Sequence, residues 1–303
     1  MVVPILHHPF TAIIAAPSCS GKSTLVFNII RQSSQLLVPS TTSAAESREA
    51  TTTTPAIIRK RREGGGGGGF DAVFIIYRSW QPLYEEMQKE LGPFMSINFF
   101  EKTFPPNYSS LSDLLECSGA SCPLIVIDDG LSTENQREIQ DLFTRHSHHL
   151  RVSVILLTQS IFDAREPTLR LCHRNAKILI LFSCPRDQGS LRTLVYQMHP
   201  DKKKAQLLLK TMEEILQKPY SYIMIDFQQE CPVEQRYKTN ILSESPLIFT
   251  FPNTYCYSSS SYQTAGNPTA ADRFSQLSTF SESSSVSRGG GGVSASGGSA
   301  AGR

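Results

Sequence analysis

The sequence predicts a three-layer α/β fold, in which a central and mostly parallel sheet carries helices on both faces. Aliphatic runs of strand length alternate along the chain with helix-like segments, the order that a parallel sheet requires. Polar and charged residues follow several of these runs directly, where parallel sheets bind ligands. With 303 residues, 40% of them hydrophobic, the chain can bury a sizeable core.

Composition narrows the functional classes. The net charge is only +2, so any contact with nucleic acid has to be local. The seven cysteines are scattered without a C-x-x-C pair, which predicts reduced thiols in an intracellular protein rather than disulfides or a zinc site. No apolar run approaches the roughly 18 residues of a membrane span, and residues 1–10 lack signal-peptide features. We therefore expect a soluble protein that is not secreted.

The residues that follow the first apolar run, 11–15, predict a phosphate-binding loop for ATP. Strand, loop and helix follow in the order that such a loop needs, and its backbone N–H groups would cradle phosphate oxygens. Lys22 would reach the β- and γ-phosphates, and the Ser23 hydroxyl would hold Mg²⁺. The residues predicted to bind the nucleotide are Ala16, Pro17, Ser18, Cys19, Ser20, Gly21, Lys22, Ser23 and Thr24.

The loop departs from the usual pattern at its first position, where Ala16 replaces a glycine. Alanine does not tolerate a positive φ, so we expect the start of the loop to be tighter than usual or slightly re-aimed. The alternative interpretation is a chance Gly-Lys-Ser sequence at the start of an ordinary helix. The motif therefore depends on support from the rest of the chain.

Composition also divides the chain into a domain, an insertion and a tail. Residues 32–69 are rich in Ser, Thr and Ala and end in six glycines, which is typical of disorder. Their basic cluster, residues 59–62, is either a nuclear-localisation signal or a solvated charge run. Residues 253–303 form a Ser/Gly-rich tail that we also expect to be disordered. Residues 1–31 and 70–252 are expected to form a single domain.

A later apolar run, residues 123–128, ends in two carboxylates. We expect Asp128 to hold Mg²⁺ and Asp129 to orient or deprotonate the attacking water. The alternative is a buried strand that merely ends in a solvated turn. Between the insertion and this run, the sequence predicts strands at 72–77 and 95–100 and helices at 81–91 and 111–116.

The segment after the acidic pair predicts a helix. Residues 133–136 resemble a capping box, and Ile139, Leu142 and Phe143 share one face of the helix that follows. The three histidines within residues 145–149 suggest a metal site at first sight. Because no matching carboxylates or thiols lie nearby, a polar loop is the favoured interpretation.

The strand expected at residues 152–159 ends in Gln159, which would sense the γ-phosphate or position its water, or is simply a turn residue. Arg165, Arg170 and Arg174 precede the next strand, 176–182. Sequence order places one of these arginines to act as an arginine finger, in cis or in a neighbouring subunit. The other two are expected to be surface charges or structural pairs.

The last part of the domain predicts helices at 188–198 and 202–217, a strand at 220–226 and an edge element at 236–242. Three lysines, 202–204, stand at a helix start, where cations are unfavourable. They are a candidate contact to a DNA backbone, although solvated charges are more common there.

Together these stretches resemble the viral genome-packaging ATPases of the FtsK–HerA superfamily, found in polinton and adintovirus elements and more distantly in poxviruses. A strand and a helix between the phosphate loop and the acidic strand also indicate the RecA-like, additional-strand class of P-loop NTPases. The likeness covers roughly residues 9–251 without the insertion. It is carried by residues 124–131, 142–154, 157–162, 170, 175–177, 185–187 and 220–241.

The resemblance implies an oligomeric, ring-forming, Mg²⁺-dependent ATPase that pumps double-stranded DNA into a capsid. The implied partners are DNA and a capsid or portal-vertex protein, with no membrane, and the implied location is the host nucleus or the virion. Its catalytic residues would be Lys22, Asp129, Gln159 and Arg170, and its metal ligands Ser23 and Asp128.

Ala16 and the insertion are not part of the family pattern, and the insertion is also compatible with an integrated, decaying or host-modified copy. Two further functions fit the sequence. The first is DNA translocation by a related ATPase in a transposon, a conjugation-like system or a host-domesticated role. The second is ATP binding without turnover, as a switch or scaffold.

Overall fold

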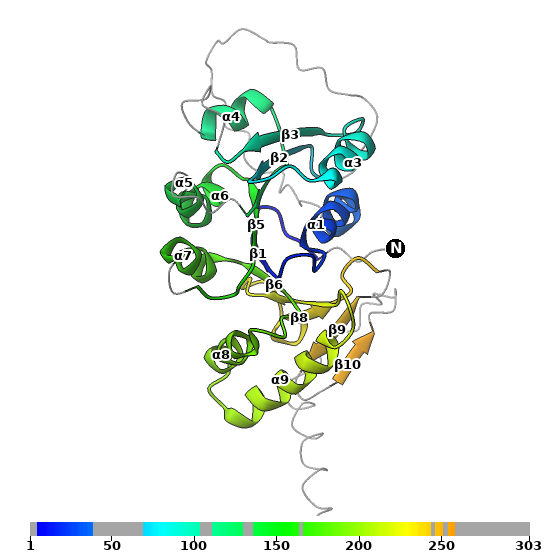
Figure 1. Ribbon diagram of the computed structural model, residues 1–303, viewed down its shortest axis with the longest axis vertical. Coiled ribbons are helices and arrows are strands. Elements are labelled where there is room, and N and C mark those ends of the chain that lie inside the picture. The colour runs from blue at the N-terminus through cyan, green and yellow to red at the C-terminus, as the bar shows by residue number, and fades with distance from the viewer. Residues whose placement is uncertain are drawn as a thin grey trace, which may run out of the picture. The chain divides into compact units, whose positions relative to one another are not determined.

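The computed structural model describes residues 5–38, 69–103, 111–129, 136–163, 166–243, 246–250 and 254–257. Within them, ten strands form one sheet in the order β10-β9-β8-β7-β6-β1-β5-β4-β2-β3 (Figure 1). The strands are β1 (Thr11–Ala15), β2 (Ala72–Tyr77), β3 (Ser96–Glu101), β4 (Pro123–Asp128), β5 (Ser153–Thr158), β6 (Ile178–Phe182), β7 (Tyr222–Asp226), β8 (Tyr237–Thr239), β9 (Leu247–Thr250) and β10 (Thr254–Tyr257).

Helices connect the strands. They are α1 (Lys22–Arg31), α2 (Ser33–Leu36), α3 (Pro82–Leu91), α4 (Leu111–Ser118), α5 (Gln136–Asp141), the π-helical turn η1 (Leu142–His146), α6 (Ser147–His149), α7 (Pro167–Asn175), α8 (Gln188–Met198), α9 (Lys202–Leu216) and the short 3₁₀ turn η2 (Val233–Gln235). In the part of the chain that the structure describes, no helix combines the length and apolar character needed to cross a bilayer.

The six strands from β3 to β6 in the sheet order run parallel and form the parallel half of the sheet. Strand β1 lies in the middle of the sheet, between β5 and β6, and β5 separates it from β4. This order confirms the predicted α/β class with a strand inserted between the loop strand and the acidic strand. Because all six strands run the same way, their carboxyl ends meet at one edge.

The sheet has a hydrophobic core on each face, which gives the three predicted layers. Neighbouring residues of β1 point to opposite faces, so Ile13 enters one core and Ile14 the other. Side chains from α1, α2 and α3 complete the Ile14 core. Side chains from α4, α5, α7, α8 and α9 complete the Ile13 core. Figure 1 shows α1 and α3 on one side of the sheet and α5 and α7 on the other.

Strands β7, β8, β9 and β10 form the antiparallel half of the sheet. The element at 236–242 was predicted to lie at an edge of the sheet. This prediction is wrong, because β8 lies inside the sheet, between β7 and β9. The predicted tail also starts too early, since Thr254–Tyr257 form β10 and pair with β9. Short strands at the end of a meander pair through their backbones, which composition does not reveal.

The predicted insertion begins too early as well. Residues 32–38 are packed, with α2 in the middle and the side chains of Leu36 and Leu37 buried. Leu37 also forms a β-bridge with Leu6. The apolar pair therefore anchors the segment despite its polar neighbours. Residues 39–68, including the basic cluster, lie outside the described part of the chain.

The histidine-rich stretch is helical rather than a loop. Helix α5 continues through η1 into α6, and Leu142, Phe143 and Ser147 are buried along this path. Burial of these three side chains holds the stretch in helical form, which the polar residues between them obscure. His148 and His149 are exposed. The described residues contain no group of three or more potential ligands that could hold a metal ion.

Candidate nucleotide-binding site

The predicted phosphate-binding loop joins β1 to α1. Ala16 is buried, and its backbone N–H donates to the carbonyl of Thr158 on β5 at 3.0 Å. Left-handed backbone occurs in this loop at Cys19, with φ 62°, and at Gly21, with φ 94°, immediately before α1. Ala16 itself has no positive φ. The missing glycine therefore imposes no backbone strain at the start of the loop.

Lys22 folds back over the start of the loop. Its Nζ donates to the carbonyls of Ala16 at 2.7 Å and of Pro17 at 3.1 Å, and the residue is only 7% exposed. Burial lowers the pKa of Lys22, and the nearby charges of Asp129 and Asp128 oppose that shift. The ammonium group is thus held inside the loop, where anionic phosphate oxygens are stronger acceptors than the two carbonyls.

Asp128, the last residue of β4, is buried at 4% exposure and fixed by three hydrogen bonds. Its Oδ2 accepts from Ser23 Oγ at 3.0 Å, from Gln81 Nε2 at 3.2 Å and from the Tyr84 hydroxyl at 2.7 Å. Burial, together with the adjacent Asp128 charge, raises the pKa of Tyr84, which keeps the phenol a donor. The two predicted metal ligands, 105 positions apart in sequence, are therefore in direct contact.

Ser23 and Asp128 are a donor set that suits Mg²⁺. A hydroxyl and a carboxylate are hard oxygen ligands, and Mg²⁺ in nucleotide sites takes few protein ligands beside water and phosphate oxygens. When bound, the ion would neutralise phosphate charge. The contact between Ser23 and Asp128 places both oxygens within reach of one small cation.

Asp129 lies one residue beyond the strand, with a φ of 51°. Aspartate is one of the few residues that adopt this left-handed conformation at low cost. The reversal separates the two carboxylates: Asp128 is buried against Ser23, whereas Asp129 is exposed and lines the cavity beside the loop. The two acids are thus suited to different roles.

A cavity of about 490 Å³ lies over the loop. Its size is within the usual range for small-molecule sites, about 300–1,000 Å³. It brings together loop residues and both acids, as predicted, but not Ala16 or Pro17, which contact Lys22 instead. The lining residues are Ser18, Cys19, Ser20, Gly21, Lys22, Ser23, Thr24, Gln81, Leu83, Asp128, Asp129 and Tyr220.

Among the described residues, Gln159, Arg170 and Arg174 do not line this cavity. Gln159 follows β5 and is exposed. The last residue of β5, Thr158, pairs with Ala15 at the end of β1, so Gln159 follows β5 where the loop follows β1, but it does not line the cavity. Arg170 and Arg174 lie on α7, which packs on the sheet face opposite α1 (Figure 1). Arg165 lies outside the described residues. The two described arginines are therefore not arranged as a finger for this chain's own cavity.

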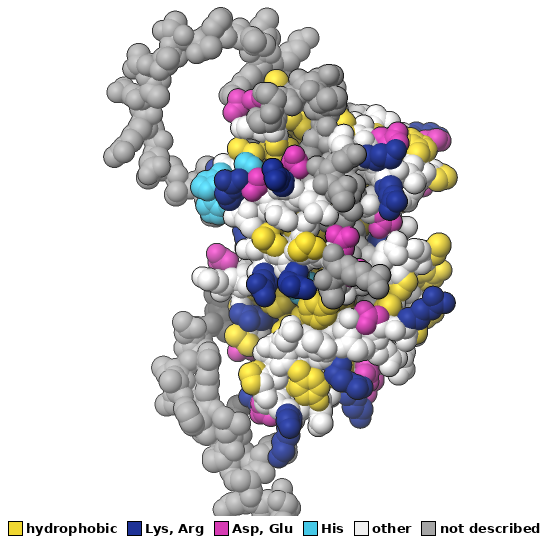
Figure 2. Space-filling model, turned by 60° about the vertical axis from the view of Figure 1, so that its left-hand side comes forward, with side chains coloured by type: hydrophobic (Ala, Val, Ile, Leu, Met, Phe, Trp, Pro, Cys, Tyr) yellow, Lys and Arg dark blue, Asp and Glu magenta, His cyan; other side chains and the backbone are white. Residues whose placement is uncertain are grey.

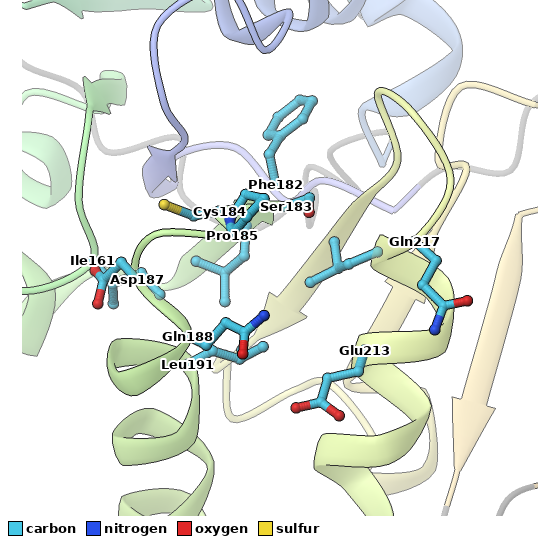
Figure 3. A pocket seen from close by; sticks show the side chains of 12 residues that line it. Ile161, Phe182, Ser183, Cys184, Pro185, Asp187, Gln188, Leu191, Glu213 and Gln217 are labelled. Carbon is cyan, nitrogen blue, oxygen red and sulfur yellow. The ribbon is translucent and has the colours of Figure 1, made fainter.

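A second cavity of about 300 Å³ lies between the end of β6 and helices α8 and α9 (Figure 3). Leu191 contributes an apolar side chain to it, and Asp187 and Glu213 supply carboxylates, whereas the ring of Phe182 points away from the cavity. It contains none of the loop residues and neither strand-end acid. Without a cation or backbone cradle for phosphate, it is the poorer nucleotide site.

Sequence reasoning missed four residues of the site: Gln81, Leu83, Tyr84 and Tyr220. Gln81 and Tyr84 come from the start of α3, directly after β2, whose neighbour in the sheet is β4. A glutamine at a strand–helix junction beside the acidic strand was a usable signal, but Tyr84 has the pattern of an ordinary core residue. The predicted strand at 220–226 includes Tyr220, which instead lies in the turn before β7.

The sheet order, the phosphate loop after β1 and the strand-end acids on β4 together define the fold of a P-loop NTPase of the additional-strand class. A comparison with protein-family models finds no match, and no curated protein matches the chain.

Among solved structures, the chain is similar to the genome-packaging NTPase B204 from Sulfolobus turreted icosahedral virus 2. In the sulfate complex the identity is 11% and the TM-score 0.42, covering 75% of this chain and 95% of that one. In the ATP-gammaS complex the identity is 12% and the TM-score 0.38, covering 74% of this chain and 94% of that one. For B204, the DNA-packaging ATPase from Sulfolobus turreted icosahedral virus, the identity is 12% and the TM-score 0.42, covering 74% of this chain and 96% of that one. Likenesses this distant assign no function, which has to come from the chain's own residues.

Proposed function

We propose that the protein is a Mg²⁺-dependent ATPase. The observation that carries the proposal is the hydrogen bond between Ser23 Oγ and Asp128 Oδ2, at 3.0 Å, at the end of the loop that holds Lys22. It joins the two halves of a metal–triphosphate site that lie far apart in sequence. If Asp128 merely ended a strand in a solvated turn, or if Gly-Lys-Ser occurred by chance, nothing would require Ser23 and Asp128 to be in contact.

The residues divide the reaction between them. The loop N–H groups and Lys22 would bind the phosphates, and Ser23 and Asp128 would hold Mg²⁺, which would supply charge neutralisation. Asp129, exposed in the cavity, is free of the contacts that fix Asp128 and would orient the attacking water as general base. Gln159 stands just beyond the lining and would complete the site when nucleotide is bound.

The wider role that we propose is translocation of double-stranded DNA into a capsid, by a ring of copies, in the host nucleus or in association with the virion. Support for it comes from the resemblance carried by many stretches of sequence rather than from one motif. Figure 2 shows Lys and Arg side chains interspersed with acidic and hydrophobic ones on one face. With a net charge of +2, the chain suits local DNA contacts better than a broad basic surface.

The test is ATP hydrolysis by the purified chain with and without Mg²⁺, and with and without double-stranded DNA. We expect Mg²⁺-dependent hydrolysis that DNA stimulates. Asp129→Asn should bind ATP normally and stop hydrolysis, whereas Asp141→Asn, an exposed acid on α5, should behave as wild type. Loss of ATP binding in Asp129→Asn would indicate a structural role for that acid.

The same assay distinguishes the DNA translocator from an ATPase of another kind and from an ATP-binding switch. Mg²⁺-dependent hydrolysis without DNA stimulation contradicts translocation and leaves an ATPase. Tight ATP binding without any hydrolysis favours the switch or scaffold. The switch has one supporting observation, the two carbonyls that hold Lys22 in the loop and that nucleotide has to displace.

Arg170 is proposed to act in a neighbouring copy, because α7 lies across the sheet from the chain's own loop. Mixing tests this directly. Lys22→Ala and Arg170→Ala copies, each inactive alone, should regain part of the hydrolysis when mixed, because one interface then has an intact loop and an intact arginine. Mixing that restores nothing would argue against Arg170 as a finger in trans.

A further inference from the structure

We infer that Tyr220 is the platform on which the nucleotide base stacks. This inference rests on the proposed function, because it names the end of the same cavity that holds the base. Tyr220 lies in the turn between α9 and β7, and its side chain lines the cavity over the phosphate-binding loop. Its Cδ1 atom is 3.7 Å from the position that a β-carbon on Gly21 would occupy. The ring therefore lies directly beside the loop.

The order of the strands fixes which end of the cavity Tyr220 occupies. Strand β4, with Asp128, lies two strands from β1 on one side, and β7 lies two strands from β1 on the other. Strand β7 runs antiparallel, and its first residue, Tyr222, pairs with Phe182 at the carboxyl end of β6. The turn that carries Tyr220 is thus at the same sheet edge as the loop, opposite the acids.

A nucleoside triphosphate has a defined direction in such a cavity. Ser23 and Asp128, which would hold Mg²⁺ and so neutralise charge on the terminal phosphates, mark the γ end. The phosphates then run along the loop, and the base leaves the loop at the far end. That end is where Tyr220 lies. An aromatic face next to the loop suits a purine or pyrimidine ring, because every base has a π-face.

The conformation of Tyr220 supports a functional role. The residue is 75% exposed and has a φ of 59°, an uncommon backbone state for a bulky side chain. Neither burial nor backbone preference explains a large ring in this place. The turn is nevertheless well fixed, since Ser221 Oγ donates to the carbonyls of Ile215 at 2.8 Å and Lys218 at 2.7 Å. The exposed ring is therefore carried by a fixed turn.

The experiment compares two probes by calorimetry, AMP-PNP with Mg²⁺ and inorganic tripolyphosphate with Mg²⁺. Tyr220→Asn removes the ring and keeps a residue that accepts positive φ, and Tyr220→Phe keeps the ring. Tyr196→Asn, at a half-exposed tyrosine on α8 outside the cavity, is the matched control. We expect Tyr220→Asn to weaken AMP-PNP by at least about fivefold and to leave tripolyphosphate unchanged. Tyr220→Phe and Tyr196→Asn should bind both probes as wild type does.

Three outcomes would overturn the inference. Equal AMP-PNP binding by wild type and Tyr220→Asn removes the stacking role and leaves the proposed function intact. Equal weakening of both probes shows that Tyr220 shapes the loop through Gly21 rather than holding the base. Failure of wild type to bind either probe contradicts the proposed function and this inference with it.

Discussion

The parallel and antiparallel halves of the sheet contribute different chemistry to the same cavity. The parallel half ends in the loop of Lys22 and in Asp128 and Asp129, which suit phosphate and metal. The antiparallel half contributes the exposed ring of Tyr220. The comparison indicates that the reaction depends on the parallel half, whereas the antiparallel half contributes stability and affinity. Substitutions in the two halves should therefore have different consequences.

The largest effect is expected in the parallel half, from Lys22→Ala. Without the buried ammonium group the loop cannot hold the β- and γ-phosphates, and we expect kcat/KM for ATP to fall by about 1,000-fold or more. Lys89→Ala, at an exposed lysine on α3, is the control and should hydrolyse ATP normally. Steady-state phosphate release measures both. Turnover retained by Lys22→Ala would remove the phosphate-loop assignment.

In the antiparallel half, the largest effect should be on stability. Lys238 Nζ lies 3.1 Å from Asp226 Oδ2, and the two side chains are 5% and 4% exposed. Asp226→Asn leaves a buried ammonium without its counter-charge, so we expect the free energy of unfolding to fall by about 3 kcal/mol. Urea unfolding measures the change.

Two controls sharpen this prediction. Asp141→Asn breaks the pair with Arg145, in which the Arg145 side chain is 63% and the Asp141 side chain 38% exposed, and should cost about 0.5 kcal/mol or less. Replacing the buried pair together, by Asp226→Leu with Lys238→Met, should recover most of the stability. Hydrolysis per folded molecule should be normal in Asp226→Asn, because Asp226 lies at the opposite end of β7 from Tyr222. A specific loss of hydrolysis would contradict the division between the halves.

The sequence predicted the parallel half well. Its inner strands, such as β1 and β4, are largely aliphatic runs buried on both faces, and strand direction brings Ser23 and Asp128 to one edge. The antiparallel half was predicted less well, since β8, β9 and β10 are short and depend on pairing rather than composition.

Tyr84 and Tyr220, which tertiary packing brings to the site, could not be predicted from the sequence. Tyr84 shows apolar periodicity like any core residue, and only the fold brings its hydroxyl to Asp128. Tyr220 stands next to a strand in sequence, and its place beside Gly21 depends on how β7 pairs with β6. In both cases the neighbour in space is remote in sequence, and no local pattern records it.

A smaller effect is expected from Tyr84→Phe, which tests the support of the acid in the parallel half. The change removes the 2.7 Å hydrogen bond to Asp128 and leaves those from Ser23 and Gln81. A hydrogen bond to a charged group contributes about 1.5–3 kcal/mol, so we expect stability to fall by about 1.5 kcal/mol. We also expect half-maximal activity to need about tenfold more Mg²⁺, at the low end of the effect of other outer-shell changes.

Tyr77→Phe is the matched control, because its ring lies 5.5 Å from that of Tyr84 while its hydroxyl is not among the described donors to Asp128. Activity measured against Mg²⁺ concentration distinguishes the two. If both variants had the same Mg²⁺ dependence as wild type, Tyr84 would be a packing residue only.

The smallest expected effect is on pH dependence, and both halves should show it. His8 contacts Ser153 on β5 in the parallel half, and His199 contacts Tyr237 on β8 in the antiparallel half. Burial lowers the pKa of each histidine below its usual 6.5. For His8, the positive charges of Arg151 and Lys177 lower the pKa further. For His199, the charges of Lys204 and Arg236 do the same. As the pH falls through 6.5, the unfolded chain therefore binds protons before the folded chain does, and stability is lost.

Thermal unfolding between pH 7.5 and 5.5 measures this loss. His8→Gln and His199→Gln each remove one group that takes up a proton on unfolding, so each variant should lose less stability over this pH range than wild type. The two changes should add, because the histidines lie on different halves of the sheet and share no described partner. A wild-type stability that does not fall below pH 6.5 would contradict the lowered pKa values, and a non-additive pair would show that the two halves are coupled.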